Sequence, residues 1–467
     1  MLDLIIKNGK IITPTEIVNG ALAILKGKIV KLGNEADFDD ADLVIDAKEN
    51  WVLPGLIDPH VHLGPAPHSL SFEKYLEELG KDFYTETLAA LFGGITTVFS
   101  FFPVTTQYEK LRNAFKQVGE TNSFIDFAYH FIVDGKQNAN DFLKIMKKGA
   151  SFKFFYNAYK GKEGHVLGYP STDESQMYNF FKLLSEQKDV LALVHAEDAE
   201  IIKILSNHLK KLGRNDLAAW TESRPNSCEY TRVLSALEIA KVTNVETYFV
   251  HISTPESIEA IQLASKSGFK VCAETCPHYL TLDQSLEKSI GNWGKVNPPL
   301  RDIHQQNALW SAIKNGYIKH IGSDNCPRDR MTKEQGVQYN NIWAAPPGFA
   351  NGVEHLLPLL MTEGINKKRI DMTDLVKVCS ENNAKRFGLY PRKGNLLPGA
   401  DADIIIVDAN KEIKVDEHFY HGIGREWSPY FGWIFKGIVE HTIVGGKLLM
   451  SGRRILGKQG SGKYLGN

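Results

Sequence analysis

Two histidines, His60 and His62, stand two residues apart at the end of an apolar run, so both rings point to the same side of an extended chain. An isolated pair of this kind is weak evidence for a site, because coincidence explains it equally well. Three later apolar runs also end in metal-binding groups, namely His195, His251 and Asp324. Imidazole nitrogens and carboxylate oxygens bind zinc and similar divalent ions. The pattern therefore indicates a metal site built from several strand ends.

One charged residue, Lys153, interrupts the apolar run SFKFFY at 151–156, where a charge on a central strand is costly. Two interpretations stay open. The lysine could extend its charged end to the rim of the sheet. Alternatively, a buried amine with a lowered pKa has reacted with carbon dioxide to give N6-carboxylysine, a carbamate whose anionic oxygens can bridge two metal ions.

The second interpretation predicts two divalent ions, because four histidines, one aspartate and a carbamate exceed the needs of one tetrahedral site. The carbamate and a hydroxide would lie between the ions, an arrangement that activates water for hydrolysis. The two ligand sets would be His60, His62 and Asp324 for one ion, and His195 and His251 for the other.

These side chains need a fold that brings several strand ends together. Between 54 and 387, short apolar runs alternate with longer helical patterns, which is typical of repeated βα units. Eight such units predict an α/β fold of the (β/α)₈ TIM-barrel type, whose active site lies at the carboxyl ends of the strands. The expected strands are 52–62, 97–102, 124–133, 151–156, 190–195, 247–252, 269–275 and 319–324.

The two ends of the chain are β-rich and differ from this middle part. The runs LIIKNGKII and EHTIVGGKLLM both place a Gly-Lys turn between apolar segments. Matching β-rich ends around a barrel predict a small β-sandwich assembled from both termini. The expected limits are 1–53 and 388–467 for the two parts of the sandwich and 54–387 for the barrel.

Composition and charge exclude several classes of function. The 467 residues include 54 Lys and Arg against 55 Asp and Glu, so the net charge of −1 offers no footprint for nucleic acid or an anionic membrane. No apolar run approaches the ~20 residues that cross a bilayer. The five cysteines are an odd number and too scattered for a disulfide framework, which favours a reducing compartment. We therefore expect a cytoplasmic protein with a small-molecule substrate.

The chain contains six motifs in this order: GLIDPHVHLG, GASFKFFYNAYKG, VHAED, FVHIST, GSDNCP and KGNLLPGADADIIIVD. Together they resemble the amidohydrolase superfamily in its cyclic-amide branch of hydantoinases, dihydropyrimidinases, allantoinases and dihydroorotases. The resemblance runs over nearly the whole chain. It implies hydrolysis of a cyclic amide or imide by two zinc or other divalent ions per subunit, a carbamylated Lys153, and a homo-oligomer, either a tetramer or a dimer.

The expected mechanism agrees with the chemistry of these groups. Two metal ions lower the pKa of a bridging water and hold the resulting hydroxide against the carbonyl carbon. Asp324 would ligate one ion, take the proton from the hydroxide as general base, and deliver it to the departing ring nitrogen as general acid. A role for Asp324 as a metal ligand only stays open.

The features that distinguish members of the branch point in different directions. Dihydroorotases typically follow the HxH pair with an arginine that binds the substrate carboxylate, and Gly64 stands there in this chain. Arg301 or Arg328 could replace it. The run KVNPPLR, with Asn297, resembles dihydroorotases, and ETCPHYLTL resembles allantoinases. The longer segments around Lys153 and after residue 425 resemble hydantoinases and dihydropyrimidinases, so we expect a hydantoin or dihydropyrimidine substrate and keep allantoinase and dihydroorotase as alternatives.

Two substrate contacts are expected from the resemblance, Tyr159 and Asn297. The substrate-binding tyrosine of hydantoinases follows the lysine in a KxFxAYK pattern, but one extra residue intervenes here, so Tyr156 is the alternative to Tyr159. Asn325 stands where the family usually has histidine, and the loop at 161–171 is longer than expected. A non-catalytic scaffold relative is the rival class, which the full set of six candidate ligands disfavours.

Overall fold

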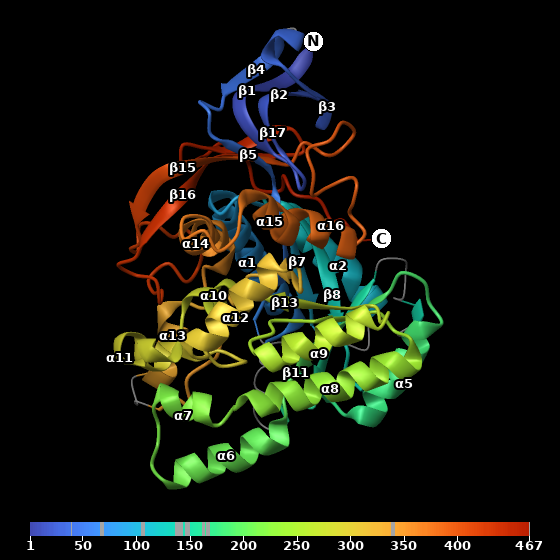
Figure 1. Ribbon diagram of the computed structural model, residues 1–467, viewed down its shortest axis with the longest axis vertical. Helices are drawn as coiled ribbons and strands as arrows, with labels where there is room; N and C mark the ends of the chain where they lie inside the picture. Colours follow the sequence, from blue (N-terminus) through green and yellow to red (C-terminus); the bar gives the residue numbers. More distant parts are fainter. Residues whose placement is uncertain are drawn as a thin grey trace.

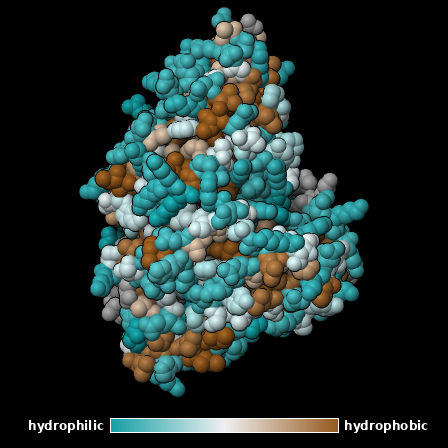
Figure 2. Space-filling view, in the orientation of Figure 1, coloured by the Kyte–Doolittle hydropathy of each residue, from teal (hydrophilic) through white to brown (hydrophobic). Residues whose placement is uncertain are grey.

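The structure is a computed structural model in which the chain builds two sheets. It describes residues 1–38, 40–65, 70–103, 108–135, 143–144, 150–160, 164, 169–337 and 341–466. Figure 1 shows the blue strands of the N-terminal part and the orange-red strands of the C-terminal part at the upper end of the molecule, with a larger body below them; the C-terminus itself lies lower, beside that body. On the face seen in Figure 2, hydrophilic side chains predominate and hydrophobic ones form separate smaller groups.

The larger body is a barrel of parallel strands in the order β6-β7-β8-β9-β11-β12-β13-β14, with the short β10 paired to β9. The barrel closes where Val61 pairs with Asn325 and the backbone N–H of His62 donates to the carbonyl oxygen of Asn325 at 2.8 Å. This arrangement confirms the predicted (β/α)₈ fold. The strands are β6 (Leu56–Val61), β7 (Ile95–Phe102), β8 (Asp126–Ile132), β9 (Ser151–Tyr156), β10 (Ser171–Thr172), β11 (Leu191–Ala196), β12 (Thr247–Phe249), β13 (Val271–Thr275) and β14 (Ile318–Ile321).

Most barrel strands are buried along their whole length, as expected for parallel strands covered by helices on the outside. Several of the covering helices start at a side chain that accepts a hydrogen bond from the first turn: Ser71 at α1, Asp173 at α5, Asp198 at α6 and Asp302 at α12. These caps fix where each connection leaves a strand end and enters its helix.

The helices of the described residues follow the strands in the alternation predicted from the sequence. They are α1 (Phe72–Phe92), α2 (Tyr108–Asn122), α5 (Glu174–Ser185), α6 (Ala199–Lys211), α7 (Leu217–Glu222), α8 (Asn226–Thr243), α9 (Pro255–Lys266), α10 (Pro277–Thr281), α11 (Glu287–Ile290), α12 (Ile303–Lys314), α13 (Arg330–Val337), α14 (Gly352–Leu359), α15 (Met372–Val376) and α16 (Asn382–Arg386), with π-helical turns at Leu360–Ile365 and Lys377–Glu381 and 3₁₀ turns at Glu35–Asp37, Gln284–Leu286 and Gly291–Gly294. Within the described part of the chain, none of these helices combines the length and hydropathy needed to cross a bilayer.

The second sheet joins both termini in the order β18-β17-β16-β15-β5-β1-β2-β3, and β4 pairs with β1. Its apolar side chains form a core of their own. The sandwich predicted from both termini is therefore confirmed, whereas the exact domain limits of 1–53, 54–387 and 388–467 stay a prediction. The strands are β1 (Leu2–Ile12), β2 (Ile17–Leu25), β3 (Lys28–Gly33), β4 (Ala41–Asp46), β5 (Trp51–Pro54), β15 (Ile404–Lys414), β16 (Ile434–Val444), β17 (Lys447–Ser451) and β18 (Arg454–Ile455).

The single strand expected over 52–62 is wrong, because two strands of different sheets occupy this segment. β5 pairs with β1 and β15 in the terminal sheet, and β6 pairs with β7 in the barrel. Gly55 separates them, and a Cβ atom there would lie 2.3 Å from the side chain of Thr96. Only a residue without a side chain fits where the chain passes from one sheet to the other.

Candidate metal centre

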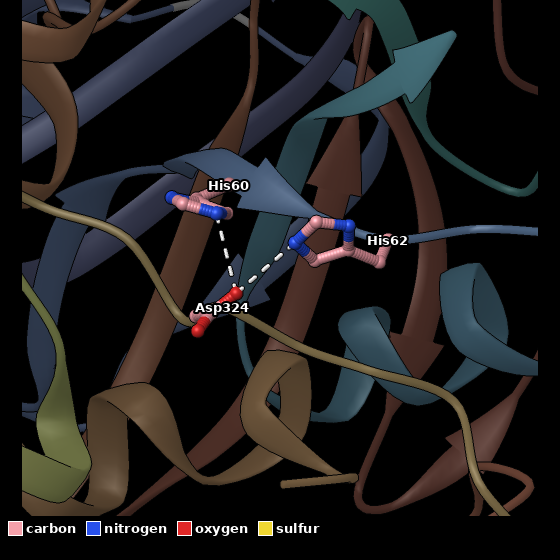
Figure 3. Close-up of side chains that lie close together, drawn as sticks. All are labelled: His60, His62 and Asp324. Carbon is pink, nitrogen blue, oxygen red and sulfur yellow. Dashed lines mark ion pairs between the residues drawn. The ribbon is translucent and has the colours of Figure 1, made fainter. Parts of the chain in front are cut away.

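Three of the predicted ligands meet at the mouth of the barrel, as Figure 3 shows. His60 and His62 come from the end of β6, and Asp324 follows β14. Oδ1 of Asp324 lies 3.2 Å from Nε2 of His60 and 3.2 Å from Nε2 of His62. The ligand atoms of all three lie within 4.8 Å of one another, a spacing that one metal ion could bridge.

The second predicted ligand pair lies beside the first. His195, at the end of β11, places Nδ1 2.8 Å from Nε2 of His251, which follows β12. The ring centroids of His60 and His251 are 5.5 Å apart, so the two sets adjoin. The fold therefore brings the candidate side chains of the two sets together, and their role as metal ligands stays a prediction.

Lys153 lies in the middle of β9 with only 1% of its surface exposed, so the rim interpretation is wrong. Its Nζ atom lies 4.9 Å from the ring centroid of Phe101 and 5.2 Å from that of Phe155. Burial lowers the pKa of Lys153 to about 8, although the negative charges of Asp324 and Glu274 oppose the shift. A lowered pKa increases the fraction of neutral amine, which is the form that reacts with carbon dioxide.

Two of the gathered side chains stand on strained backbone. His251 has a φ of 40° and Asp324 a φ of 51°, values that non-glycine residues seldom adopt. Each such residue costs about 1–3 kcal/mol, which the surrounding structure must offset. The left-handed turn directly after β12 and β14 aims these side chains at the centre of the mouth.

The electrostatics of the first ligand set favour an ionised aspartate. Burial alone would raise the pKa of Asp324, but the two histidines lower it well below its usual value. Burial alone would lower the pKa of His60, but Glu274 and Asp324 raise it to about 9. Burial lowers the pKa of His62 to about 4, which keeps that imidazole neutral. An ionised Asp324 and a neutral His62 are the forms that bind metal ions, whereas His60 gives up a proton when it ligates.

Three residues that sequence reasoning missed form hydrogen bonds with ring nitrogens of the candidate histidine ligands. Oε1 of Glu274 lies 2.7 Å from Nδ1 of His60, and Oε2 of Glu197 lies 2.9 Å from Nε2 of His195. The hydroxyl of Tyr169 lies 3.0 Å from Nδ1 of His62. The charged residue inside the buried run VCAET was a signal for Glu274, of the same kind as the one that revealed Lys153. Tyr169 gave no comparable signal.

A cavity of about 1150 Å³ adjoins the first ligand set at His62. Among its lining residues are His62, Tyr159 and Asn297. Both side-chain polar atoms of Asn297 are buried and have no hydrogen-bond partner among the described residues. The hydroxyl of Tyr156, in contrast, bonds to Oγ of Ser235 at 2.6 Å and does not line the cavity. The cavity thus has room for a small ring, and the amide of Asn297 is available to bind it.

The two arginines considered for a substrate carboxylate differ in position. Arg301 does not line the cavity: its guanidinium donates to the carbonyl of Arg224 at 2.5 Å and to Oγ of Ser253 at 3.2 Å. Arg328 lines the cavity, and its Nε donates to the carbonyl of Pro347 at 3.1 Å. Arg328 is thus the better placed of the two for meeting an anionic group.

Asn325 stands where the family usually has histidine. Its side chain faces away from the two ligand sets. Its Nδ2 donates to Glu86 at 2.8 Å and its Oδ1 accepts from the backbone N–H of Gly352 at 2.8 Å. It thereby ties the closure of the barrel to α1 and α14. The expectation of a long loop at 161–171 falls mostly on 161–163 and 165–168, which lie outside the described residues.

Comparisons with known proteins agree with this geometry. The sequence profile of the amidohydrolase family matches residues 51–449. A D-hydantoinase of Geobacillus stearothermophilus is 33% identical over 476 positions, covering 99% of this chain and 96% of that protein. An L-hydantoinase of Paenarthrobacter aurescens is 31% identical, covering 100% of this chain and 98% of that one.

Solved structures give the same result. A crystal structure of a D-hydantoinase superimposes with a TM-score of 0.90 at 30% identity, covering 100% of this chain and 99% of the other. The L-hydantoinase (dihydropyrimidinase) from Arthrobacter aurescens superimposes with a TM-score of 0.91 at 28% identity, covering 100% of both chains. The chain therefore belongs to the amidohydrolase family, in its branch of cyclic amidohydrolases.

Proposed function

We propose that the protein is a binuclear-metal hydrolase that opens a cyclic amide or imide ring of the hydantoin or dihydropyrimidine type. The observation that carries this proposal is the pair of histidine sets around the buried Lys153, with His62 of the first set lining a cavity of about 1150 Å³. Relatives named as hydantoinases over the whole length of the chain support the same class of substrate.

The donor atoms fit two divalent ions, and zinc is the ion that nitrogen and oxygen donors of this kind favour. One ion would be held by His60, His62 and Asp324, the other by His195 and His251, with Lys153 between them as N6-carboxylysine. When bound, the ions supply an activated nucleophile from water near neutral pH and polarise the substrate carbonyl.

The chain's own groups would bind the ring and move the proton. Oδ1 of Asp324 faces both imidazole nitrogens, which leaves Oδ2 to accept the proton of the attacking water and pass it to the leaving ring nitrogen. The amide of Asn297 can donate to a ring carbonyl and accept from a ring N–H. The hydroxyl of Tyr159 can donate to the carbonyl oxygen as negative charge develops on it.

A neutral ring is the better match to this cavity than dihydroorotate. Gly64 provides no cation beside His62, and Arg301 does not line the cavity. A buried carboxylate without a partner costs several kcal/mol, whereas an uncharged ring incurs no such cost. Dihydroorotase activity stays an alternative through Arg328, and allantoinase activity through the ETCPHYLTL run. The six intact candidate ligands disfavour a non-catalytic scaffold.

The test is a comparison of kcat/KM for a 5-substituted hydantoin, dihydrouracil, allantoin and dihydroorotate with zinc-loaded protein. We expect hydantoin or dihydrouracil to be opened fastest. Dihydroorotate as the best of the four would contradict the substrate class, and no turnover of any of them at full metal occupancy would contradict the function. A cytoplasmic location and a dimeric or tetrameric assembly stay predictions from the sequence.

A further inference from the structure

Glu274 touches both histidine sets at once. It lies on β13 with 0% of its surface exposed. Its Oε1 lies 2.7 Å from Nδ1 of His60 and accepts from the backbone N–H of His251 at 3.1 Å. Its Oε2 accepts from the hydroxyl of Tyr248 at 2.8 Å. One carboxylate thus joins the side chain of a ligand in the first set to the backbone of a ligand in the second.

The surroundings leave Glu274 little freedom to move. A Cβ atom at Gly322 would lie 2.9 Å from Oε2 of Glu274 and 2.8 Å from Cβ of His60, so the backbone just after β14 passes directly against this pair. A buried carboxylate is costly unless hydrogen bonds satisfy it. The hydroxyl of Tyr248, the backbone N–H of His251 and the ring of His60 satisfy the carboxylate of Glu274. All three groups come from strands that carry or adjoin the candidate ligands.

The contact also fixes which nitrogen of His60 faces the centre. A histidine ligates through the nitrogen that carries no proton, and a hydrogen bond from the other ring nitrogen sets that tautomer and the ring orientation. With the Nδ1 proton donated to Glu274, Nε2 is the ring nitrogen that faces Oδ1 of Asp324, 3.2 Å away, and is the one left to ligate an ion. Without the carboxylate, the ring could rotate or exchange its tautomer.

We propose that Glu274 is a positioning residue for the metal centre: it orients His60 through Nδ1 and the turn of His251 through the backbone N–H, and so holds the two ligand sets at the separation that two ions require. This inference rests on the proposed function, because it assumes that the histidines bind metal. It assigns no direct contact with substrate to Glu274.

The test uses the Glu274→Gln variant, which keeps the shape and loses the charge. We expect its zinc affinity to fall about 10- to 100-fold, as for other partners of ligating histidines. The visible absorption spectrum of the cobalt-loaded variant should also shift, because the geometry of the ligands changes. Both readouts are independent of turnover.

The matched control is Glu354→Gln. Glu354 is also fully buried and also pairs with a histidine, since its Oε1 lies 2.8 Å from Nδ1 of His421, but it touches none of the candidate ligands. We expect it to keep parental zinc affinity and the parental cobalt spectrum. A purely structural role of Glu274 would give the two variants equal zinc affinities, and that result would overturn the inference.

A second variant, Glu274→Asp, decides the matter if Glu274→Gln does not fold. It keeps the charge but withdraws the carboxylate from His60 by one methylene, so zinc affinity and the cobalt spectrum should change here too. Parental values for this variant would overturn the inference. If the parent protein itself binds no zinc or cobalt, the proposed function fails instead, so the two failures are distinguishable.

Discussion

The hydroxyl of Tyr169 lies 3.0 Å from Nδ1 of His62, and the Tyr169 ring stacks on Phe155 with centroids 4.5 Å apart. Tyr169 also lines the cavity that adjoins His62. Tyr169 therefore contributes both to the orientation of a candidate ligand and to the wall that a substrate would meet.

Replacing Tyr169 by Phe should weaken zinc binding by up to about 10-fold, because His62 loses the partner of its second ring nitrogen. Zinc per chain after dialysis against a limiting concentration measures this effect. The control is Tyr178→Phe, since Tyr178 is 41% exposed on α5. Equal zinc content in the two variants would contradict the assigned contact.

Replacing Lys153 by Ala should remove most of the bound metal and nearly all activity, because the proposed carbamate oxygens are lost. A short-chain carboxylic acid added to the variant should restore part of both, since it supplies the missing oxygens. Elemental analysis and turnover with and without the acid measure the outcome. Lys160→Ala serves as control, because Lys160 lines the cavity but pairs with Glu200 at 3.3 Å. Full activity of Lys153→Ala would refute the carbamate.

Replacing Asp324 by Asn should lower turnover at least ~10²-fold at full metal occupancy, because the amide cannot accept and return the proton. Turnover must be measured on protein whose metal content has been verified, so that loss of ligation is separated from loss of proton transfer. Asp329→Asn is a suitable control, since Asp329 lines the same cavity and caps Thr332. A rate near that of the parent would leave Asp324 as a metal ligand only.

The stability of the fold should fall in acid through its buried histidines, of which His355 is a clear case. Burial lowers the pKa of His355 to about 3, and its Nδ1 lies 3.2 Å from the hydroxyl of Tyr420. The unfolded chain, with an ordinary histidine pKa of about 6.5, therefore binds this proton more readily than the folded protein does. The contribution of His355 is fully present above pH ~6.5 and is lost as the pH falls from there toward ~3.

For this one group, the free energy of unfolding should fall by up to about 1.4 kcal/mol per pH unit in that window. Urea unfolding of metal-free protein between about pH 7 and pH 4 measures the slope, which His355→Gln should reduce. His418→Gln is the control, because the His418 side chain is 85% exposed. The same slope in both variants would show that His355 does not resist protonation.

The sequence was sufficient for the barrel and for the gathering of ligands because both depend on local signals. An apolar run of strand length that ends in His195 or Asp324 indicates a buried strand with a polar residue at its carboxyl end. The fold brings these strand ends together at one end of the barrel. The same reasoning singled out Lys153, since a lone charge in an apolar strand is conspicuous, but it left open whether the side chain reaches the rim or stays buried.

Contacts between distant segments could not be predicted in this way. Glu274 and Tyr169 act through neighbours that only the closed barrel provides, and no sequence spacing reports a hydrogen bond to His60 or His62. The break at Gly55 was missed because both adjoining runs are apolar and extended, so nothing local shows that they belong to different sheets. The positive φ of His251 likewise depends on the packing around it.

The closure of the barrel has a kinetic consequence. The backbone of His62 bonds to that of Asn325, so the first and last barrel strands meet at the candidate metal centre. During synthesis, His60 and His62 leave the ribosome long before Asp324, and contacts between such distant segments form late and slowly. A chain arrested before β14 would hold histidines without their aspartate. Zinc uptake should therefore accompany the last step of folding. Once bound, the ion would slow the separation of the first and last barrel strands.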